Sequence, residues 1–441
     1  MEAAPQSVDL LIEARWVLPV EPADLCLAHH AVAVASGRIV DVLPIAEARR
    51  RYAAATRVEL RDHLLMPGLV NIHGHAAMTL LRGYADDLPL MRWLRERIWP
   101  AEVKHAGEQF VHDGTLLACA EMLRGGITCA NDMYFYPDAA ARAFDRAGMR
   151  ALIGIIAIDF PTAYASDATD YLAKGLATRD LWRNNERIGF ALAPHAPYTA
   201  GDNTLSQVGL LAAQLDLPIH IHIHETADEI RQSMQEHGVR PLARLARLGL
   251  LGPQFIGVHA VHCDEQDIQL LAHHGCHVAH CPSSNMKLAS GIAPIAQMLD
   301  AGINVGLGSD GAASNNRLDL FQEMRHTALL AKVAHCDATR LPAHRVVQMA
   351  TLDGARALGV DRYIGSIRSG KFADLCAVNF GSAHLQPVYD PASHLVYVAG
   401  RDDVSHVWIQ GEPLVENGKL LHLSNESMLA LTSVWQNALS A

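Results

Sequence analysis

The sequence predicts an α/β protein: a (β/α)8 TIM barrel with a small β-sandwich domain built from both ends of the chain. Three observations support this prediction. The middle of the 441-residue chain alternates short apolar strands with helical stretches, in the number and spacing that such a barrel requires. Both chain ends are rich in strand and turn signals. Half of the residues are hydrophobic and 19% are charged, as in a globular protein with a sizeable core.

Residues 1–62 are expected to form the N-terminal part of the sandwich. Residues 8–12, 31–35 and 39–43 are short apolar runs typical of strands, and Ser36-Gly37-Arg38 is a turn between the last two. A module of this size buries little apolar surface on its own. It therefore needs further strands from elsewhere in the chain.

Residues 63–372 are expected to form the barrel. The predicted strands are residues 68–73, 127–132, 151–156, 189–194, 218–222, 255–259, 276–280 and 304–308, with amphipathic segments such as 205–215 and 293–299 between them. Eight strand–helix units over about 250 residues are typical of a (β/α)8 barrel. The alternative is a doubly wound open sheet, but such a sheet normally carries a glycine-rich phosphate loop after its first strand. This chain has His73-Gly74-His75 there, which favours the barrel.

Residues 373–441 are expected to complete the sandwich. Strand and turn signals return at residues 373–378, 406–409 and 410–413. If these strands pair with those of the first 62 residues, the barrel is a domain inserted into the sandwich. Residues 426–441 have a helical pattern, and this terminal helix would pack either on the barrel or on a neighbouring molecule.

The charge balance limits the partners of the protein. Lys and Arg total 36 and Asp and Glu total 47, so the formal net charge is −11. An acidic protein has no general attraction to phosphate backbones or anionic lipid, so neither nucleic acid nor a membrane is expected as a partner. The sequence has no apolar run near the roughly 18 residues of a membrane helix and no signal-peptide pattern, so a cytoplasmic location is expected. The eight cysteines form no C-x-x-C pair and are expected to be reduced thiols.

Chemically active side chains gather at the predicted strand ends, where barrel enzymes place their catalytic groups. Histidine, the commonest metal ligand, is frequent in this chain, with 25 residues. Six of the eight predicted strands end in metal-competent groups: His73-Gly74-His75, His195, the run His220 to Glu225, His259, His280 and Ser309-Asp310. This distribution predicts an active site at the mouth of the barrel.

Four of these residues predict a metal site. His73 and His75 are two positions apart, so both side chains leave an extended strand on the same face. A third histidine and a carboxylate from across the barrel would complete a set of three nitrogens and one oxygen, which suits a divalent ion such as zinc. We choose His222 as the third histidine because it leaves Glu225 just beyond the strand end, and Asp310 as the carboxylate.

The neighbouring polar residues have separate expected roles. His220 lies deeper on its strand and is expected to be a core residue or to support a ligand, whereas the role of His224 is left open. Glu225 is expected to transfer protons, because partial burial raises the pKa of a carboxyl group. By strand order, His259 is close enough to orient or deprotonate a water bound at the metal site, without itself binding the metal. Asp310 would serve as a ligand and as a base for that water.

The motifs around these residues resemble the amidohydrolase superfamily over nearly the whole chain. They are Pro67 to His75, His222-Ile223-His224-Glu225, His259, Gly308 to Asn315, Ala350 to Gly359 and Gly370 to Leu375. Within the superfamily, the chain resembles the chlorohydrolase-like branch that includes the 5′-methylthioadenosine/S-adenosylhomocysteine deaminases.

The resemblance implies one divalent metal ion per subunit, zinc or alternatively ferrous iron. Its ligands would be His73, His75, His222 and Asp310. Relatives with two metal ions bridge them with a carboxylated lysine on a middle strand. This chain has no lysine at the end of such a strand, and Lys174 lies in a helical stretch. A single ion is therefore favoured.

The resemblance also implies the reaction, which is hydrolytic deamination of an adenine ring. Water would add to C6 of the purine and ammonia would leave, giving the inosine analogue. Glu225 would hand a proton to the purine N1, and His259 would help to activate the water. Asp310 would accept the proton of the water and pass it to the leaving amino group.

The substrate implied by the resemblance is a small purine nucleoside. Trp93 and Glu102 match positions that cover the substrate and bind its ribose hydroxyls, and His195 matches a purine contact. Ser314 is assigned to the substrate site beside the proton-transfer residues. Two alternatives are a deaminase or dechlorinase of another ring, such as guanine, a pterin or an s-triazine, and a non-catalytic scaffold. Many relatives are dimers or tetramers, so this chain could also form a homo-oligomer.

One departure from the family pattern bears on the substrate. Relatives that bind the amino-acid end of S-adenosylhomocysteine use arginine at the end of the third strand and in the following loop. Here residues 154–160 are Gly-Ile-Ile-Ala-Ile-Asp-Phe, and no arginine follows before Arg179. An apolar wall leaves a carboxylate unpaired, which costs more free energy than the contact returns. We therefore expect 5′-methylthioadenosine or adenosine to be preferred over S-adenosylhomocysteine.

Overall fold

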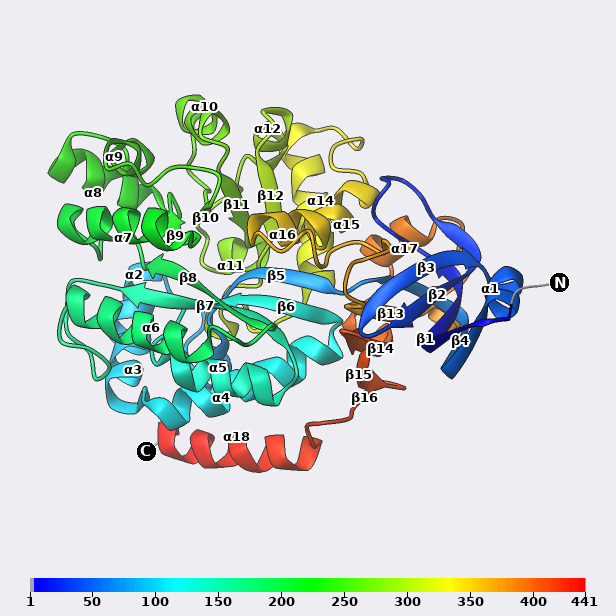
Figure 1. Cartoon of the computed structure of the whole chain (residues 1–441). Helices are drawn as coiled ribbons and strands as arrows, with labels where there is room; N and C mark the ends of the chain where they lie inside the picture. The colour runs from blue at the N-terminus through cyan, green and yellow to red at the C-terminus, as the bar shows by residue number, and fades with distance from the viewer. Residues whose placement is uncertain (1–3, 441) are drawn as a thin grey trace.

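The computed structural model describes residues 4–440, whose strands form two eight-stranded sheets (Figure 1). One sheet is the barrel, and its strands follow one another in chain order with parallel pairing. These strands are β5 (Leu69–Gly74), β6 (Ile127–Asp132), β7 (Arg150–Ala157), β8 (Ile188–Pro194), β9 (Ile219–Ile223), β10 (Phe255–His259), β11 (His277–His280) and β12 (Asn304–Leu307). Each overlaps a predicted strand, so the (β/α)8 barrel is confirmed.

Helices surround the barrel strands: most of them connect one strand to the next, and the last three follow β12 (Figure 1). They are α4 (Glu108–Arg124), α5 (Pro137–Arg146), α6 (Ala168–Trp182), α7 (Asp202–Leu215), α8 (Ala227–His237), α9 (Pro241–Arg247), α10 (Glu265–His273), α12 (Ile295–Asp300), α14 (Leu320–His335), α15 (Ala343–Met349) and α16 (Leu352–Ala357). Short polar side chains fix several of their starts. The Thr226 hydroxyl caps α8, for example, and Asp264 forms a capping box on α10.

Shorter helices follow the C-terminal ends of the barrel strands and build the rim of its mouth. They are η1 (Ala76–Leu81), α2 (Leu90–Trp93), η2 (Leu94–Ile98) and α3 (Trp99–His105) after β5, α11 (Pro282–Lys287) after β11, and α13 (Ala312–Asn315) after β12. In barrel enzymes this end of the strands carries the active site. These rim segments therefore supply part of the side chains that can cover a ligand.

The second sheet joins the two ends of the chain. Its order is β16-β15-β14-β13-β4-β1-β2-β3. The strands are β1 (Gln6–Val17), β2 (Leu27–Ala35), β3 (Arg38–Pro44), β4 (Tyr52–Pro67), β13 (Leu375–Asn379), β14 (Val404–Ile409), β15 (Glu412–Glu416) and β16 (Lys419–Leu420), with α1 (Ile45–Arg51), η3 (Ala383–Leu385), α17 (Pro391–Tyr397) and η4 (Arg401–Asp403) between them. The expected pairing of the two chain ends in one β-rich unit is confirmed.

The sequence did not predict β4, the strand that makes this pairing. It lies parallel to β1 and antiparallel to β13, and its last residues lead directly into β5 of the barrel. The first half of β4 includes Thr56, Arg57 and Glu59, which are all exposed, so it lacks the apolar run used to recognise the other strands. The central strand of the joint sheet therefore has the weakest sequence signal.

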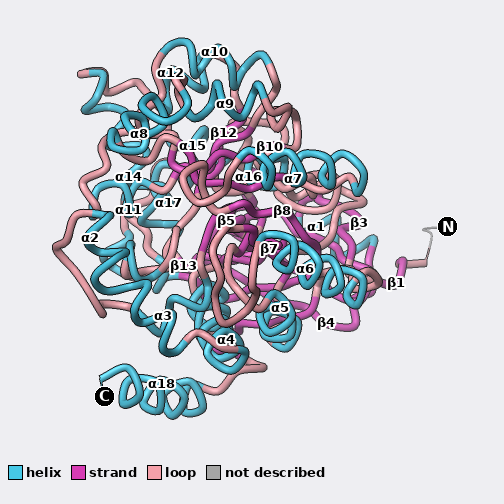
Figure 2. Tube along the Cα trace, turned by 90° about the vertical axis from the view of Figure 1, so that its left-hand side faces the viewer, coloured by secondary structure: helices cyan, strands magenta, loops and turns pink. Residues whose placement is uncertain are grey.

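The terminal helix α18 (Asn425–Ser440) lies along the outside of the barrel beside α4 (Figures 1 and 2). The Trp435 ring packs edge-on against Phe110 of α4, with 5.2 Å between the ring centroids, and Trp435 Nε1 donates a hydrogen bond to Asp113 Oδ2 at 3.0 Å. Of the two placements expected for this helix, the structure therefore shows packing on the barrel. Within residues 4–440, no helix has the length and apolar character of a membrane span.

Candidate active site

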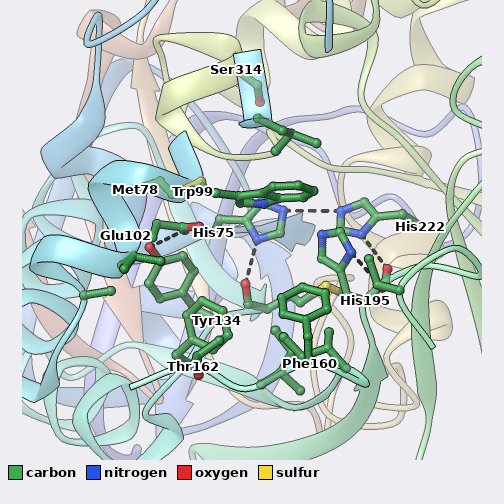
Figure 3. Close-up of a pocket in the computed structure, with 18 of the residues that line it drawn as sticks. His75, Met78, Trp99, Glu102, Tyr134, Phe160, Thr162, His195, His222 and Ser314 are labelled. Atoms are coloured by element: carbon green, nitrogen blue, oxygen red, sulfur yellow. Dashed lines mark hydrogen bonds between the residues drawn. The ribbon is translucent and has the colours of Figure 1, made fainter. Parts of the chain in front are cut away.

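A cavity of about 670 Å³ opens at the C-terminal ends of the barrel strands (Figure 3). Its floor is formed by the side chains that the sequence placed at strand ends: His75, His195, His222, Glu225, His259 and Asp310. Its walls come from the rim helices and from the loops after β6 and β7, and they are mostly aromatic or aliphatic. A cavity of this size suits a small molecule.

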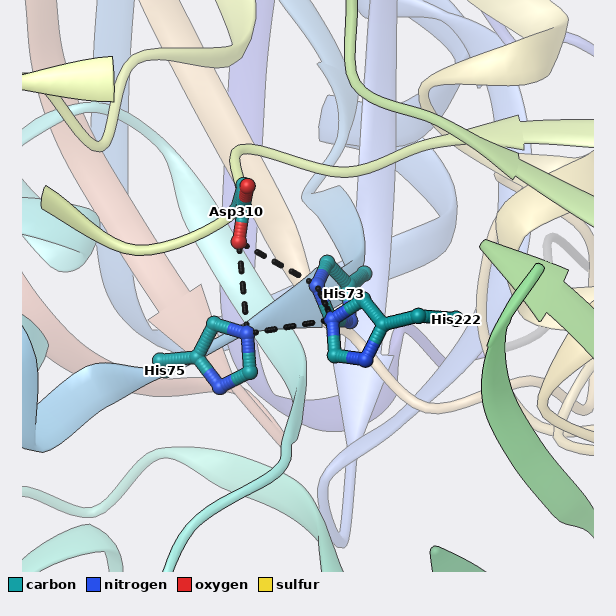
Figure 4. Close-up of side chains that lie close together, drawn as sticks. All are labelled: His73, His75, His222 and Asp310. Carbon is teal, nitrogen blue, oxygen red and sulfur yellow. Dashed lines mark hydrogen bonds and ion pairs between the residues drawn. The ribbon is translucent and has the colours of Figure 1, made fainter. Parts of the chain in front are cut away.

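Three histidine rings present the same nitrogen to one point (Figure 4). His75 Nδ1 is 2.6 Å from the carbonyl oxygen of Met133, and His222 Nδ1 is 2.7 Å from the carbonyl oxygen of His195. A carbonyl oxygen can only accept, so each Nδ1 donates its proton there. Each Nε2 then keeps its lone pair. The same arrangement holds for His73, whose Nδ1 contacts a neighbouring imidazole rather than a carbonyl oxygen.

The donor atoms have the spacing of a small metal site. His222 Nε2 lies 3.2 Å from His73 Nε2 and 3.3 Å from His75 Nε2, and Asp310 Oδ1 lies 3.3 Å from each of the last two. Ligand atoms about 2.0–2.1 Å from a tetrahedral ion are about 3.3 Å from one another. Lone pairs this close repel unless a cation lies between them. The four predicted ligands therefore come together and fit a divalent ion.

Burial favours the neutral form of two ligand rings: it lowers the pKa of His73 to about 4 and the pKa of His222 well below its ordinary value. At His75 burial acts in the same direction, but the facing Asp310 carboxylate outweighs it and raises the pKa. Burial also acts to raise the pKa of Asp310, but the facing His73 and His75 rings outweigh it and hold this pKa well below its usual range. Neutral imidazoles and an ionised carboxylate are the protonation states that a metal requires of its ligands.

The protein holds both oxygens of Asp310. Oδ1 faces the histidines and also accepts a hydrogen bond from the backbone N–H of Gly311 at 2.7 Å, whereas Oδ2 accepts hydrogen bonds from Ser284 Oγ at 2.6 Å and Ser314 Oγ at 2.9 Å. The backbone of Asp310 donates to the carbonyl oxygen of His73 at 3.1 Å, which ties the end of β12 to the end of β5. These bonds fix the direction in which Oδ1 points.

Glu225 and His259 lie together beside the metal ligands. Glu225 Oε2 is 3.9 Å from His259 Nε2, and His259 Nδ1 is 2.9 Å from Asn285 Oδ1. An amide oxygen accepts, so His259 donates from Nδ1 and its Nε2 is free to accept a proton from the cavity. Burial raises the pKa of Glu225, and the charge of His259 only partly opposes this. Glu225 is therefore suited to hold a proton and release it to a ligand in the cavity.

Three of these residues have left-handed backbones. The φ angles are 53° at His224, 71° at His259 and 58° at Asp310, immediately after β9, at the end of β10 and shortly after β12. Non-glycine residues seldom adopt this conformation, and such residues cluster at functional sites. Here the conformation turns each chain sharply at the mouth of the barrel.

The residues predicted to bind substrate all line the cavity. Glu102 accepts a hydrogen bond from the Tyr134 hydroxyl at 2.6 Å, and burial raises its pKa to about 7 even though this bond opposes the rise. Burial lowers the pKa of His195 to about 3, so its ring is neutral. Ser314 is on the wall opposite Tyr134 and Phe160 (Figure 3), and its hydroxyl donates a hydrogen bond to Asp310. Trp93 is only 5% exposed and donates to the carbonyl oxygen of Ala85.

The sequence reasoning missed several residues of the site. Trp99 lines the cavity and is half-buried, so more of its side chain is accessible than that of Trp93. Ser284 and Asn285 hold Asp310 and His259, and a polar run directly after the seventh predicted strand was the signal for them. Glu229 contacts the backbone of the turn before α8, and its signal was a Thr-x-x-Glu capping pattern.

The fold and the four converging donors define a (β/α)8-barrel protein with a divalent-metal centre at the mouth of the barrel. Residues 64–414 match the Amidohydrolase family. The chain belongs to this family, which confirms the resemblance seen in its motifs.

Comparison with known proteins extends over the whole chain. It is 46% identical over 435 residues to the 5-methylthioadenosine/S-adenosylhomocysteine deaminase of Teredinibacter turnerae, covering 99% of this chain and 98% of that one. A crystal structure of an adenosine deaminase from Xanthomonas campestris with bound zinc is 49% identical, with a TM-score of 0.98 over 99% of this chain and 100% of that one. Atrazine chlorohydrolase from Arthrobacter aurescens with zinc has a TM-score of 0.88 over 97% and 99% of the two chains. At 24% identity, this last likeness shows the fold alone.

Proposed function

We propose that this chain is a metal-dependent hydrolase that removes the 6-amino group of an adenine nucleoside, giving the inosine analogue and ammonia. One observation carries the proposal: three of the four metal ligands (His75, His222 and Asp310) line a single cavity together with Glu225 and His259, and this cavity is large enough for a nucleoside. The names of the full-length relatives, an adenosine deaminase and a 5-methylthioadenosine/S-adenosylhomocysteine deaminase, support an adenine nucleoside as the substrate.

His73, His75, His222 and Asp310 would hold the ion. We propose zinc, because three nitrogens and one oxygen are a common zinc set and the Xanthomonas structure contains zinc, with ferrous iron as the alternative. When bound, such an ion lowers the pKa of water and so supplies a nucleophile near neutral pH. The side chains around it perform the remaining steps.

Three side chains would move the protons. Glu225 holds a proton because of its burial and donates it to N1 of the purine as water adds to C6. His259 accepts a hydrogen bond from the attacking water at Nε2, since its Nδ1 is committed to Asn285. Asp310 takes a proton from the water and passes it to the amino group, which leaves as ammonia. As ammonia leaves and the C6 carbonyl forms, the C6 hydroxyl proton returns to Glu225, so nucleoside and water balance the inosine analogue and ammonia.

The walls of the cavity would select the rest of the substrate. Glu102 would accept hydrogen bonds from the ribose hydroxyls, and the neutral His195 ring would contact the purine. Trp93 and Trp99 would cover the nucleoside from the rim, with Trp99 supplying more of the accessible surface. Ser314 would act near the substrate mainly by holding Asp310.

The cavity favours an apolar 5′-substituent over an amino acid. Ile156, Ile158 and Phe160 line it, and among residues 4–440 no lysine or arginine does. The carboxylate of S-adenosylhomocysteine would therefore lose hydration without gaining a charged partner. We propose that 5′-methylthioadenosine or adenosine is the preferred substrate.

The test is loss of absorbance at the adenine band with zinc-loaded enzyme and each of the three nucleosides. Fast turnover of 5′-methylthioadenosine or adenosine with weak turnover of S-adenosylhomocysteine is the expected result. A higher kcat/KM for S-adenosylhomocysteine would overturn the preference. No turnover of any of them by metal-loaded enzyme would overturn the nucleoside and direct attention to guanine, pterin or s-triazine rings. Glu225→Gln, loaded in the same way, is the matched inactive control.

A further inference from the structure

The Glu229 side chain binds the turn that carries Glu225. Glu229 lies in the first turn of α8 and is only 7% exposed. Its Oε1 accepts a hydrogen bond from the backbone N–H of His224, and its Oε2 accepts one from the backbone N–H of Glu225, both at 2.9 Å. The left-handed backbone at His224 turns two successive N–H groups toward one side, which forms a small anion-binding hollow. The carboxylate of Glu229 fills this hollow.

This contact goes beyond ordinary capping of α8. Thr226 is the N-cap residue, and its hydroxyl oxygen accepts a hydrogen bond from the backbone N–H of Glu229 at 3.3 Å. In a capping box, the third residue of the helix returns the bond to the N-cap residue itself. Glu229 instead reaches one and two residues further back, to Glu225 and His224. The carboxylate therefore stabilises the turn before the helix rather than the helix end.

The His224 side chain anchors the same turn from the other side. The backbone N–H of Leu242 donates to His224 Nε2 at 3.1 Å, so the neutral ring carries its proton on Nδ1. That nitrogen faces Asp267 Oδ2 at 3.4 Å and Cys263 Sγ at 3.7 Å. Arg240 also donates to Asp267 Oδ2, at 2.6 Å. Because His224 Nδ1 carries a proton and the Arg240 guanidinium is close by, these residues are unsuited to a second metal site. Their contacts instead hold the His224 side chain in place.

We propose that Glu229 is a positioning residue for Glu225: its carboxylate holds the left-handed turn at His224 and so keeps the Glu225 carboxyl at the reacting end of the cavity. The inference rests on the proposed function, in which Glu225 delivers the proton to the substrate. Glu229 itself is not among the side chains that line the cavity. It acts only through the backbone of the two residues before Thr226.

Glu229→Gln tests this role, with Thr226→Val as the matched control. The glutamine amide can accept only one of the two N–H groups, because its NH₂ faces the other donor. A catalytic group displaced by about 1 Å can cost about 10²-fold in rate, so we expect kcat to fall by about that factor with KM and zinc content nearly unchanged. Thr226→Val removes the cap of the same helix but leaves both Glu229 bonds, so it should lower the melting temperature comparably and keep kcat.

Crystal structures of the two variants supply a readout that does not depend on activity. We expect the Glu225 side chain or the φ angle of His224 to shift in Glu229→Gln and to stay unchanged in Thr226→Val. The inference would be overturned if Glu225 and His224 keep their wild-type positions in Glu229→Gln, or if kcat falls equally in Glu229→Gln and Thr226→Val. If the wild-type enzyme deaminates no adenine nucleoside, the proposed function fails, and the crystal structures still decide whether Glu229 holds the turn. Should Glu229→Gln not fold, Glu229→Asp, with its shorter reach, takes its place under the same criteria.

Discussion

His220 lies directly behind the ligand His73, with 2.9 Å between His220 Nε2 and His73 Nδ1. His220 is fully buried, and this burial lowers its pKa well below the ordinary histidine value, so the ring stays neutral. Its Nε2 can then accept the Nδ1 proton of His73 and leave His73 Nε2 for the metal. Of the two roles expected for His220 from the sequence, support of a ligand is the one that this contact favours.

Loss of this contact should weaken metal binding. Replacing partners of metal ligands typically costs about 10–100-fold in metal affinity, and we expect a loss in this range for His220→Leu. His220→Gln keeps an acceptor near the same place and should lose less. Competition with a chromophoric chelator measures both affinities. Equal affinity of His220→Leu and wild type would contradict the orienting role.

Removal of the metal should destabilise the fold. Without a cation, three Nε2 lone pairs and an ionised carboxylate face one another at 3.2–3.3 Å. A ligand that binds only the folded state stabilises it by about 4 kcal/mol when the free ligand concentration is about 1,000 times its Kd. Removal of zinc should therefore lower the melting temperature by several degrees. Calorimetry with and without chelator measures the change. His222→Ala is the control, and its melting temperature should not respond to the chelator.

Glu225→Gln should abolish most of the turnover while leaving the metal in place. Glutamine matches glutamate in shape but cannot donate an acidic proton to the purine N1, and general acid catalysis is typically worth about 10²–10⁴-fold. We expect kcat to fall within that range, with zinc content and KM close to wild type. Steady-state kinetics and metal analysis on one preparation test both parts. A loss of zinc with the loss of turnover would instead indicate that Glu225 supports the metal.

Most of the barrel was predictable from the sequence, because its strands are buried on both sides. Parallel barrel strands such as β7 are continuous apolar runs, and the turns between them are polar. β4 lacked this signal, since about half of its residues face solvent and its place depends on partners from both chain ends. The placement of α18 was equally open, because an amphipathic helix shows that a partner exists but not which one.

The candidate ligands were predictable for a similar reason. The alternation of side chains on a strand places His73 and His75 on one face, and the parallel barrel brings His222 and Asp310 to the same end. Residues that hold these groups in place were not predictable in the same way. Asn285 matters because the short helix α11 brings it to His259. The polar run after the seventh predicted strand marks this segment, but the contact that Asn285 makes depends on the folded backbone.

Glu102 should make nucleoside binding depend on pH near neutrality. Burial raises its pKa from 4.5 to about 7, and only the ionised carboxylate accepts hydrogen bonds from both ribose hydroxyls with both oxygens. As pH rises from about 6 to about 8, the ionised fraction grows severalfold. KM for the nucleoside should therefore fall over this range. Glu102→Gln, which does not titrate, should give a KM with little dependence on pH.

The same pKa shift affects stability with the opposite sign. The folded state binds the Glu102 proton more tightly than the unfolded state, so this contribution to stability is fully present below about pH 4.5 and is lost as pH rises through about 7. Glu102→Gln should remove this decline, and thermal unfolding of ligand-free enzyme between about pH 5 and about pH 8 compares the two proteins. We expect the wild type to bind the nucleoside better and to be less stable at the higher pH, and Glu102→Gln to show neither change. Both effects would then originate in the buried Glu102 carboxyl. A KM that falls equally in wild type and variant would place the titrating group elsewhere.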